Sequence, residues 1–307
     1  MRVIFMGTPG FALPSLEVLQ ARGEDLIAVV TQPDRPQGRG RVLTPSPIKV
    51  AALRSGIPVQ QPEKVRHPEF LDWCRGAAPD LIVVVAFGQI LPKALLDIPR
   101  QGCINVHASL LPKYRGAAPI AWAIIRGETE TGITTIQMDP GMDTGPMLVR
   151  RSLMIRPDDT AGTLGERLSQ LGAQTLNETL DALKAARLSP TPQDSSQATL
   201  APMLKKEDGR INWTQSAAAI DALVRGLDPW PSAWTEYAGE TWRIWKVRVQ
   251  PEPGEAGVVL RADGTGITVG AGEGSVLITQ LQTPGKRKLA AREYLAGHAI
   301  KPGVRLG

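Results

Sequence analysis

The sequence predicts an α/β fold in which a doubly wound, mostly parallel, Rossmann-like sheet is followed by a small OB-like β-barrel. In roughly the first 180 residues, short β-branched apolar runs alternate with helical patterns, as expected for strands that are buried on both faces of a parallel sheet. The composition changes to proline and small polar residues from position 188 onward. The last third of the chain holds short strand candidates with glycine-rich turns between most of them, which is typical of a small antiparallel barrel.

The elements of the first part follow in order along the chain. Strands are predicted at residues 3–6, 26–30, 81–86, 103–106, 133–137 and 147–150. A helix over 11–22 carries leucines at helical spacing and stops at Gly23. A long amphipathic helix over 163–186 has a leucine stripe, and Thr163 and Glu166 have the spacing of a capping box at its start.

The second part of the chain begins with a connecting segment. Residues 188–205 are rich in proline and small polar residues, which indicates a linker between domains. A helix is then predicted at 216–226, and strands are predicted at 233–237, 241–249, 257–260, 266–269 and 275–282. We therefore expect a first domain at 1–187, a linker at 188–206 and a barrel domain at 207–307.

Composition places the chain among ordinary globular proteins. Hydrophobic residues make up 42% and charged residues 21% of its 307 residues. No stretch approaches the apolar length of a membrane span, and Met1 is followed directly by a strand-like run rather than by a targeting segment. The two cysteines, Cys74 and Cys103, form no disulfide framework and fit a reducing compartment. We expect a cytoplasmic protein with no membrane partner.

The charge is mildly basic. The net charge of +5 and the isoelectric point near 9.4 are compatible with an anionic partner. Basic residues gather in the proline- and glycine-rich segment 34–49 and again between 286 and 292. A solvated surface explains either cluster equally well when the cluster is taken alone, so the charge pattern raises nucleic acid only as a hypothesis.

The residues with the clearest chemical meaning are Asn105 and His107, with Asp143 further along the chain. Residues two apart in a strand point to the same face, so we expect the amide of Asn105 and the imidazole of His107 to project together. An amide donor and an imidazole can hold a developing oxyanion while a carboxylate orients the imidazole or relays a proton. The three residues together suit acyl transfer, and no serine or cysteine nucleophile is needed if the acceptor is itself an amine. For Asn105 and His107 alone, a strand end with a satisfied histidine is the alternative.

Other kinds of site have weaker support. Gly7 and Gly10 follow the first predicted strand but lack the G-x-G-x-x-G spacing of a dinucleotide site. No zinc-ligand spacing is present, so no metal is expected. Cys103 lies two residues before Asn105 and hence on the same strand face, which leaves covalent catalysis as an alternative.

Two segments around these residues resemble the folate-dependent formyltransferases. Residues 103–116 read CINVHASLLPKYRG, and residues 137–145 read QMDPGMDTG. Further segments extend the resemblance over nearly the whole chain, at 3–9, 31–36, 83–92 and 228–235. Those at 31–36 and 228–235 narrow it to members that act on transfer RNA. Asp143, rather than Asp139, occupies the position that matches the family.

The resemblance implies transfer of a formyl group from 10-formyltetrahydrofolate to the α-amine of methionine on initiator tRNA, with Asn105, His107 and Asp143 as the catalytic residues. It also implies folate contacts from two turns, at Ser109, Leu110, Leu111 and Pro112 and at Phe87, Gly88, Gln89, Ile90 and Leu91. The second turn follows a predicted strand, where an α/β sheet places its ligand crevice. A plain connection between strand and helix is the alternative there.

For the RNA partner, the resemblance points to the segment 34–49 and to one side of the barrel domain, because proteins read RNA mainly at single-stranded ends and along the backbone. The expected RNA contacts are Arg39, Arg41, Lys205, Lys206, Lys286, Arg287 and Lys288. We expect a monomer. A formyltransferase for a small-molecule amine and a non-catalytic RNA-binding protein are the alternatives. The proton route between Asp143, His107 and water is left open.

Overall fold

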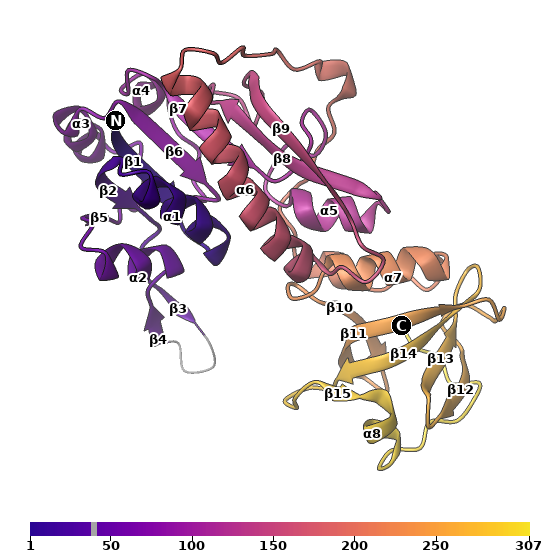
Figure 1. Cartoon of the computed structure of the whole chain (residues 1–307). Coiled ribbons are helices and arrows are strands. Elements are labelled where there is room, and N and C mark those ends of the chain that lie inside the picture. Colours follow the sequence, from indigo (N-terminus) through magenta and orange to yellow (C-terminus); the bar gives the residue numbers. More distant parts are fainter. Residues whose placement is uncertain (38–41) are drawn as a thin grey trace. The chain divides into compact units, whose positions relative to one another are not determined.

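The structure is a computed structural model that describes residues 1–37 and 42–307 (Figure 1). The chain forms two compact units. The first contains Met1–Gly116, Glu130–Met154 and Gly165–Leu200, and the second contains Ala117–Thr129, Ile155–Leu164 and Ala201–Gly307. The second unit therefore includes two short segments from the earlier part of the chain. The domain boundaries at 187 and 206 stay a prediction.

The first unit is built on a seven-stranded sheet with the order β5-β2-β1-β6-β7-β8-β9. Its strands are β1 (Arg2–Gly7), β2 (Asp25–Val30), β5 (Val59–Gln60), β6 (Leu81–Val85), β7 (Cys103–His107), β8 (Glu130–Gln137) and β9 (Met147–Met154). The pairs from β5 through β7 are parallel, whereas β7–β8 and β8–β9 are antiparallel. The predicted doubly wound, mostly parallel sheet is confirmed.

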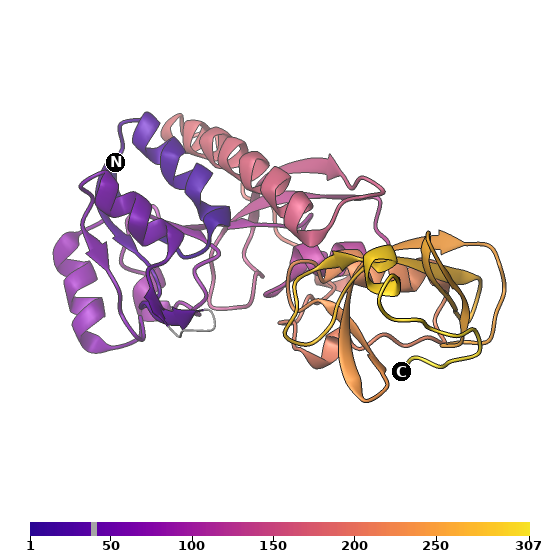
Figure 2. The same cartoon turned by 90° about the horizontal axis from the view of Figure 1, so that it is seen from below.

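Helices cover both faces of this sheet (Figures 1 and 2). On one face, buried residues of α3 (Pro68–Ala77) and α4 (Lys93–Leu96) pack against the apolar side chains of β1 and β6. On the other face, α1 (Leu13–Ala21) lies beside α6 (Ala161–Lys184). Ser169 Oγ of α6 donates a hydrogen bond to the carbonyl of Phe11, just before α1 (2.7 Å). Gly172 lets α6 approach the sheet, because a Cβ there would lie 3.2 Å from Val106. The sheet core is thereby closed on both sides.

The start of α6 differs from the prediction. Thr160 Oγ1 accepts a hydrogen bond from Thr163 N (3.2 Å), and Thr163 Oγ1 accepts one from Thr160 N (2.9 Å). The reciprocal pair is a capping box with Thr160 as the cap and Thr163 as its partner, so the predicted Thr163–Glu166 box was wrong. A threonine replaces the usual Glu or Gln partner, and the helix begins at Ala161, two residues earlier than the pattern suggested.

Three helices that were not predicted from the sequence begin at prolines. Pro47, Pro68 and Pro119 stand in the first turns of α2 (Pro47–Arg54), α3 and α5 (Pro119–Ile125). Proline fits this position because its fixed φ is helical and the amide hydrogen it lacks would have no intrahelical partner. The proline- and glycine-rich segment 34–49 is partly regular. Its described ends pair as the short strands β3 (Arg35–Gln37) and β4 (Val42–Thr44), and it runs into α2.

The second unit contains α5, α7 (Ala217–Gly226) and an antiparallel sheet with the order β10-β11-β14-β13-β12, in which β15 also pairs with β14. Its remaining elements are β10 (Ala233–Tyr237), β11 (Glu240–Gln250), β12 (Val259–Asp263), β13 (Gly266–Gly270), β14 (Ser275–Gln282), β15 (Leu289–Ala290) and α8 (Ala291–Leu295). Ser216 caps α7 by accepting a hydrogen bond from Ala219 N (3.2 Å). Trp242 is fully buried in the hydrophobic core of this unit.

The last residues close this sheet. Val259 N donates to the Val304 carbonyl (2.7 Å) on the β12 side, and Leu306 N donates to the Gly257 carbonyl (2.8 Å). Gly307 N then donates to the carbonyl of Glu236 in β10 (2.9 Å). Since β10 and β12 are the two ends of the strand order, the terminal segment bridges them. The predicted small antiparallel barrel is confirmed.

The segment predicted as a linker follows the surface of the first unit over much of its length. Thr191 forms a β-bridge with Met147, and Leu200 forms one with Arg115. Between them, Thr199 Oγ1 accepts a hydrogen bond from Tyr114 N (2.9 Å). Residues 191–200 thus belong to the first unit by their contacts.

Candidate active site

His107 lies at the carboxyl end of β7, where a parallel sheet presents ligand-binding residues. Its side chain is 6% exposed. Nε2 lies 2.9 Å from the Tyr114 carbonyl oxygen, which can only accept, so Nε2 must carry a hydrogen. Nδ1 is then the nitrogen that gains or loses a proton, and it lies 3.5 Å from Asp143 Oδ2. The histidine is therefore oriented on one side and faces a carboxylate on the other.

Asp143 lies in the connection between β8 and β9, in the left-handed region at φ 54°. Oδ2 accepts a hydrogen bond from Gly116 N (2.9 Å), and Oδ1 accepts one from Asn105 Nδ2 (3.3 Å). The turn beyond it is tight, since a Cβ at Gly145 would overlap the Gln137 carbonyl oxygen. The backbone of this connection therefore aims the Asp143 carboxylate at the end of β7.

Asn105 completes the group. It pairs with Ile136 of β8 in the sheet register and is half-buried. One hydrogen of its side-chain amide is directed to Asp143, and a primary amide carries a second donor that this contact does not use. The structure thus brings Asn105, His107 and Asp143 together on one side of β7, as the two-residue spacing predicted. Their catalytic roles stay a prediction.

Asp139 has a different task. Its Oδ1 accepts hydrogen bonds from Gly141 N (3.1 Å) and from Thr144 Oγ1 (2.7 Å), which ties the turn that leads to Asp143. Nothing connects Asp139 to His107 in the described hydrogen bonds. The carboxylate that faces the imidazole is that of Asp143.

The first predicted folate turn, residues 109–112, directly follows β7. Ser109 is fully buried, and its Oγ donates to the Lys113 carbonyl (2.6 Å). Leu111 is also buried, and its N–H donates to Thr134 Oγ1 (3.1 Å). These two residues brace the turn from within, whereas Leu110 and Pro112 are only half-buried. Of the four predicted folate contacts in this turn, Leu110 and Pro112 are therefore the ones with apolar side chains accessible to a ligand.

The second predicted folate turn, residues 87–91, connects β6 to α4. Phe87 and Leu91 are buried in the sheet core. The Phe87 carbonyl accepts hydrogen bonds from Thr8 Oγ1 (2.9 Å) and Gln32 Nε2 (3.3 Å). The ends of β1 and β2 are therefore tied to the end of β6, which shapes the carboxyl edge of the sheet around one turn.

The side chain of Gln89 is used within the protein. Its Oε1 accepts from Val65 N (3.0 Å), and its Nε2 donates to the Pro62 carbonyl (3.2 Å). Gly88 and Ile90, by contrast, are exposed, and Ile90 is 80% exposed. Main-chain groups and Ile90 are thus the accessible parts of this turn for a ligand.

The expected RNA contacts divide into three groups. Arg39 and Arg41 lie outside the described residues. Lys205 and Lys206 are exposed just before a short 3-10 helix of the second unit. The third group, Lys286, Arg287 and Lys288, occupies the exposed connection between β14 and β15 and is called the barrel cluster below.

The two ends of the segment 34–49, which contains Arg39 and Arg41, are joined by polar contacts. Asp34 Oδ2 lies 2.6 Å from Lys49 Nζ, and Asp34 Oδ1 accepts a hydrogen bond from Gln61 Nε2 (2.8 Å). The hydrogen bond from Lys49 and then that from Gln61 hold the pKa of the Asp34 carboxyl below its usual value. Asp34, the only acidic residue of the segment 34–49, therefore anchors this segment.

Cys103 does not support covalent catalysis. The thiol is buried in the core beneath α3 and α4, and burial raises its pKa to about 12. A nucleophilic cysteine needs a thiolate, which such an environment suppresses. Among the residues 1–37 and 42–307, no group of three or more His, Cys, Asp or Glu side chains is arranged to hold a metal ion.

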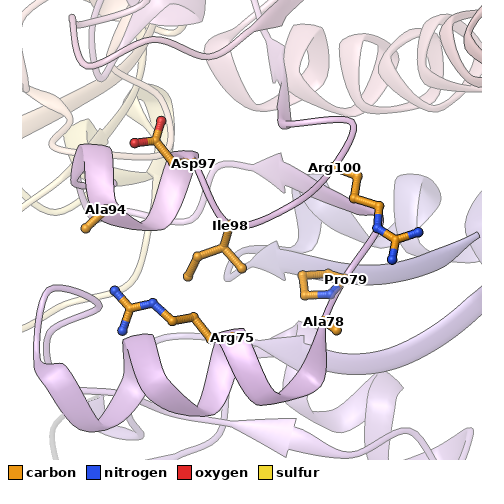
Figure 3. Close-up of a pocket in the computed structure, with 7 residues that line it drawn as sticks. All are labelled: Arg75, Ala78, Pro79, Ala94, Asp97, Ile98 and Arg100. Carbon is orange, nitrogen blue, oxygen red and sulfur yellow. The ribbon is translucent and has the colours of Figure 1, made fainter.

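A separate pocket of about 470 Å³ lies near the amino ends of strands β6 and β7 (Figure 3). Its lining residues are Arg75, Ala78, Pro79, Ala94, Asp97, Ile98 and Arg100. These residues precede β6 and β7, so the pocket adjoins the amino ends of the strands whose carboxyl ends carry the candidate active site. This pocket is therefore separate from the candidate active site.

No helix in the described part of the chain is long and apolar enough to cross a membrane.

Comparison with known proteins decides the family. Residues 1–180 match the family model described as formyl transferase, and residues 203–299 match that of the formyl transferase C-terminal domain. The chain belongs to the formyl transferase family. It is a formyl-transferring enzyme by that membership, and the predicted family resemblance is confirmed.

Close relatives share the whole length of the chain. It is 57% identical over 307 residues to the methionyl-tRNA formyltransferase of Geobacter sulfurreducens, covering 100% of this chain and 97% of the relative. It is 49% identical over 302 residues to the methionyl-tRNA formyltransferase of Desulfotalea psychrophila, covering 98% of this chain and 94% of that protein.

Solved structures share the fold at lower identity. WlaRD, a sugar 3N-formyl transferase crystallised in the presence of dTDP and 5-N-formyl-THF, aligns with a TM-score of 0.69 at 18% identity, over 94% of this chain and 99% of that one. HypX from Aquifex aeolicus, in complex with tetrahydrofolic acid, aligns with a TM-score of 0.66 at 18% identity. The alignment covers 96% of this chain but 47% of the HypX chain.

Some contacts of the site were missed by sequence reasoning. The Gly116 amide and the Tyr114 carbonyl hold Asp143 and His107, yet both residues were noted only as part of the motif 103–116. These are backbone groups, which every residue type possesses. No side-chain signal in the sequence could have identified them.

Proposed function

We propose that this chain transfers the formyl group of 10-formyltetrahydrofolate to the α-amine of methionine on initiator tRNA. The observation that carries the proposal is the 57% identity over the full chain to a methionyl-tRNA formyltransferase. The convergence of Asn105, His107 and Asp143 at the carboxyl edge of the first sheet supports it, because these groups suit acyl transfer to an amine.

In this proposal, the α-amine attacks the formyl carbon, and a carbon–nitrogen bond forms. The resulting oxyanion receives a hydrogen bond from the free donor of the Asn105 amide and from His107 when Nδ1 is protonated. The bond between the formyl carbon and N10 of the folate then breaks. The proton lost by the amine reaches N10, directly or through water, with Asp143 and His107 Nδ1 as the groups able to carry it.

The geometry of His107 supports a proton route through Nδ1 in this proposal. Its Nε2 hydrogen is committed to the Tyr114 carbonyl, so proton exchange falls to Nδ1, which faces Asp143. The Asp143 carboxylate orients the ring through its contact with Nδ1. In this proposal, the one hydrogen on Nδ1 is either donated to the oxyanion or passed to Asp143.

We also propose that folate lies against Leu110, Pro112 and the turn at 87–91, and that the barrel cluster with Lys205 and Lys206 contacts the tRNA. The exposure of these basic side chains supports the second assignment. A monomer acting in the cytoplasm fits this function. The two buried free cysteines, Cys74 and Cys103, agree with a reducing compartment.

The test is a formylation assay on the purified chain with 10-formyltetrahydrofolate and methionyl initiator tRNA, in which formylmethionine is detected after the ester is hydrolysed. The control replaces the charged tRNA by a dTDP-linked amino sugar. We expect product only with the tRNA. Turnover of the amino sugar with an inert tRNA would favour the small-molecule alternative, and binding of tRNA without any turnover would favour the non-catalytic one.

A further inference from the structure

Gln193 lies in the segment that leaves α6, where the sequence indicated only a linker. Its Nε2 donates hydrogen bonds to the carbonyl oxygens of Asp143 and Gly145, each at 2.7 Å. Its Oε1 accepts hydrogen bonds from Arg115 Nε (3.0 Å) and Nη2 (2.8 Å). A side-chain amide has two hydrogens to donate and two lone pairs to accept with, so every hydrogen-bonding position of Gln193 is occupied.

Arg115 fixes the orientation of this amide. The arginine is 8% exposed, and its guanidinium cannot accept a hydrogen bond. Since its two nitrogens require the oxygen of Gln193, the amide nitrogen must point the other way, toward Asp143 and Gly145. Arg115 N also donates to the Thr199 carbonyl (2.9 Å), which joins it to the same segment.

The backbone that Gln193 holds needs an external support. Asp143 is a non-glycine residue in the left-handed region, and Gly145 passes close to the Gln137 carbonyl. The connection from β8 to β9 is neither helix nor strand at this point, so no ladder of hydrogen bonds fixes the Asp143 carbonyl. Gln193 supplies that partner. The orientation of the Asp143 carboxylate follows from the orientation of its backbone.

We propose that Gln193, oriented by Arg115, is a positioning residue that holds Asp143 in reach of His107 and Asn105. The inference rests on the proposed formyl transfer and adds the segment between the two family domains to the catalytic structure. The same segment also supports the other side of the site, because Thr199 Oγ1 accepts from Tyr114 N and the Tyr114 carbonyl holds His107.

The first test is Gln193→Met, which keeps the length of the side chain and removes all its hydrogen bonds. The matched control is Gln197→Met, since Gln197 lies in the same segment, is exposed, and donates only to Asp194 (2.9 Å). We expect Gln193→Met to lower kcat by about 10- to 100-fold, because a small displacement of a catalytic group costs that much. KM for tRNA and for folate should change little. A kcat equal to that of Gln197→Met would overturn the inference.

The second test asks whether Gln193 acts through Asp143. The variants Gln193→Met and Asp143→Asn are measured alone and together as a double-mutant cycle. When Asp143 is already replaced by asparagine, we expect Gln193→Met to lower kcat by less than about twofold more. The effects of residues that act as a unit are strongly non-additive. Additive losses would overturn the inference. If Asp143→Asn alone kept wild-type turnover, the proposed role of Asp143 would fail instead, and the two failures are thus distinguishable.

A third variant protects the test against misfolding. Gln193→Glu keeps an oxygen for Arg115 but places a carboxylate against the carbonyl oxygens of Asp143 and Gly145. We expect it to fold, with a Tm close to that of the wild type, and to lose kcat as Gln193→Met does. Wild-type turnover in Gln193→Glu would show that the donated hydrogen bonds are not needed, and would overturn the inference even if Gln193→Met were insoluble.

Discussion

At the carboxyl end of β7, Asn105, His107 and Asp143 are each held by a neighbour within the first unit, whereas Lys286 and Arg287 in the barrel cluster extend into solvent. His107 is 6% exposed, and the Asp143 carboxyl is 15% exposed. The difference follows from the tasks proposed for the two regions. A catalytic group must be placed before the reaction, whereas a phosphate contact needs only a charge within reach.

Replacing His107 or Asn105 by alanine should have the largest effect. Each donor proposed for the oxyanion is worth on the order of 10²–10³ in rate, so His107→Ala and Asn105→Ala should each lower kcat by about that factor. Folate binding, measured by titration, should stay near the wild-type value. Turnover close to wild type in either variant would remove that residue from the chemistry and would weaken the contrast with the barrel cluster.

The second prediction separates the two aspartates of the β8–β9 connection. Asp143→Asn keeps the shape but removes the charge beside His107, so we expect kcat to fall by about 10², as for loss of a general acid–base group. Asp139→Asn is the control, because an amide oxygen can still accept from Gly141 N and Thr144 Oγ1. In steady-state kinetics, Asp139→Asn should have a kcat close to that of the wild type. The reverse ranking would exchange the roles of the two residues.

The barrel cluster should respond in KM rather than in kcat. Replacing Lys286 and Arg287 by alanine should raise KM for tRNA several-fold. The slope of the logarithm of tRNA affinity against the logarithm of salt concentration should fall by about one unit for each charge removed. Lys288 provides a control inside the cluster. Its Nζ lies 3.2 Å from the centre of the Trp245 ring and 3.7 Å from Asp228 Oδ1, so it is already engaged within the barrel unit.

We therefore expect Lys288→Ala to affect tRNA binding less than the other two changes, with kinetics measured at two salt concentrations. An unchanged KM for tRNA after loss of both Lys286 and Arg287 would place the RNA contact elsewhere on the chain.

The smallest effect concerns an ion pair that serves folding alone. Glu24 is buried and lies 2.6 Å from Lys184 Nζ. Burial raises the pKa of Glu24, but the hydrogen bond from Lys184 and that from the N-terminal ammonium outweigh it, so this pKa lies below the usual 4.5. A lowered folded-state pKa stabilises the protein above the unfolded value, and this contribution is lost as the pH falls through the folded value.

Accordingly, Lys184→Met should lower Tm near pH 7 by roughly 2–4 °C. The difference from wild type should shrink below about pH 4.5, where Glu24 becomes protonated in the unfolded state. Thermal unfolding of both proteins at several pH values measures this difference in Tm. A difference that stays constant down to pH 3 would mean that Lys184 acts through packing rather than through its charge on Glu24.

Much of the fold was predictable because buried strands leave a simple signal. The apolar runs at 3–6, 26–30, 81–86 and 103–106 each correspond to a strand of the parallel sheet. The helices that open with Pro47, Pro68 and Pro119 were missed for a physical reason. Proline breaks a helix in its interior but favours its first turn, and composition alone does not say which applies.

The candidate site divides in the same way. Asn105 and His107 were predicted to share a face because side chains alternate along a strand, and this holds in any β-sheet. Their separation from Asp143 along the chain is large, so only the pairing of β7 with β8 brings the carboxylate to them. The supports from Tyr114, Gly116 and Gln193 had no signal of their own in the sequence.

By itself, the sequence determined the fold class, the buried strands, the two cysteines without a disulfide framework, and the pair Asn105 and His107, whose chemistry suits acyl transfer. These depend on residue types and on short spacings, which are local properties of a chain. The tertiary structure alone decided which nitrogen of His107 faces Asp143 and which segment holds Asp143 in place. Such choices rest on backbone carbonyl and amide groups that become neighbours only when distant segments pack together, and every residue type supplies a carbonyl acceptor.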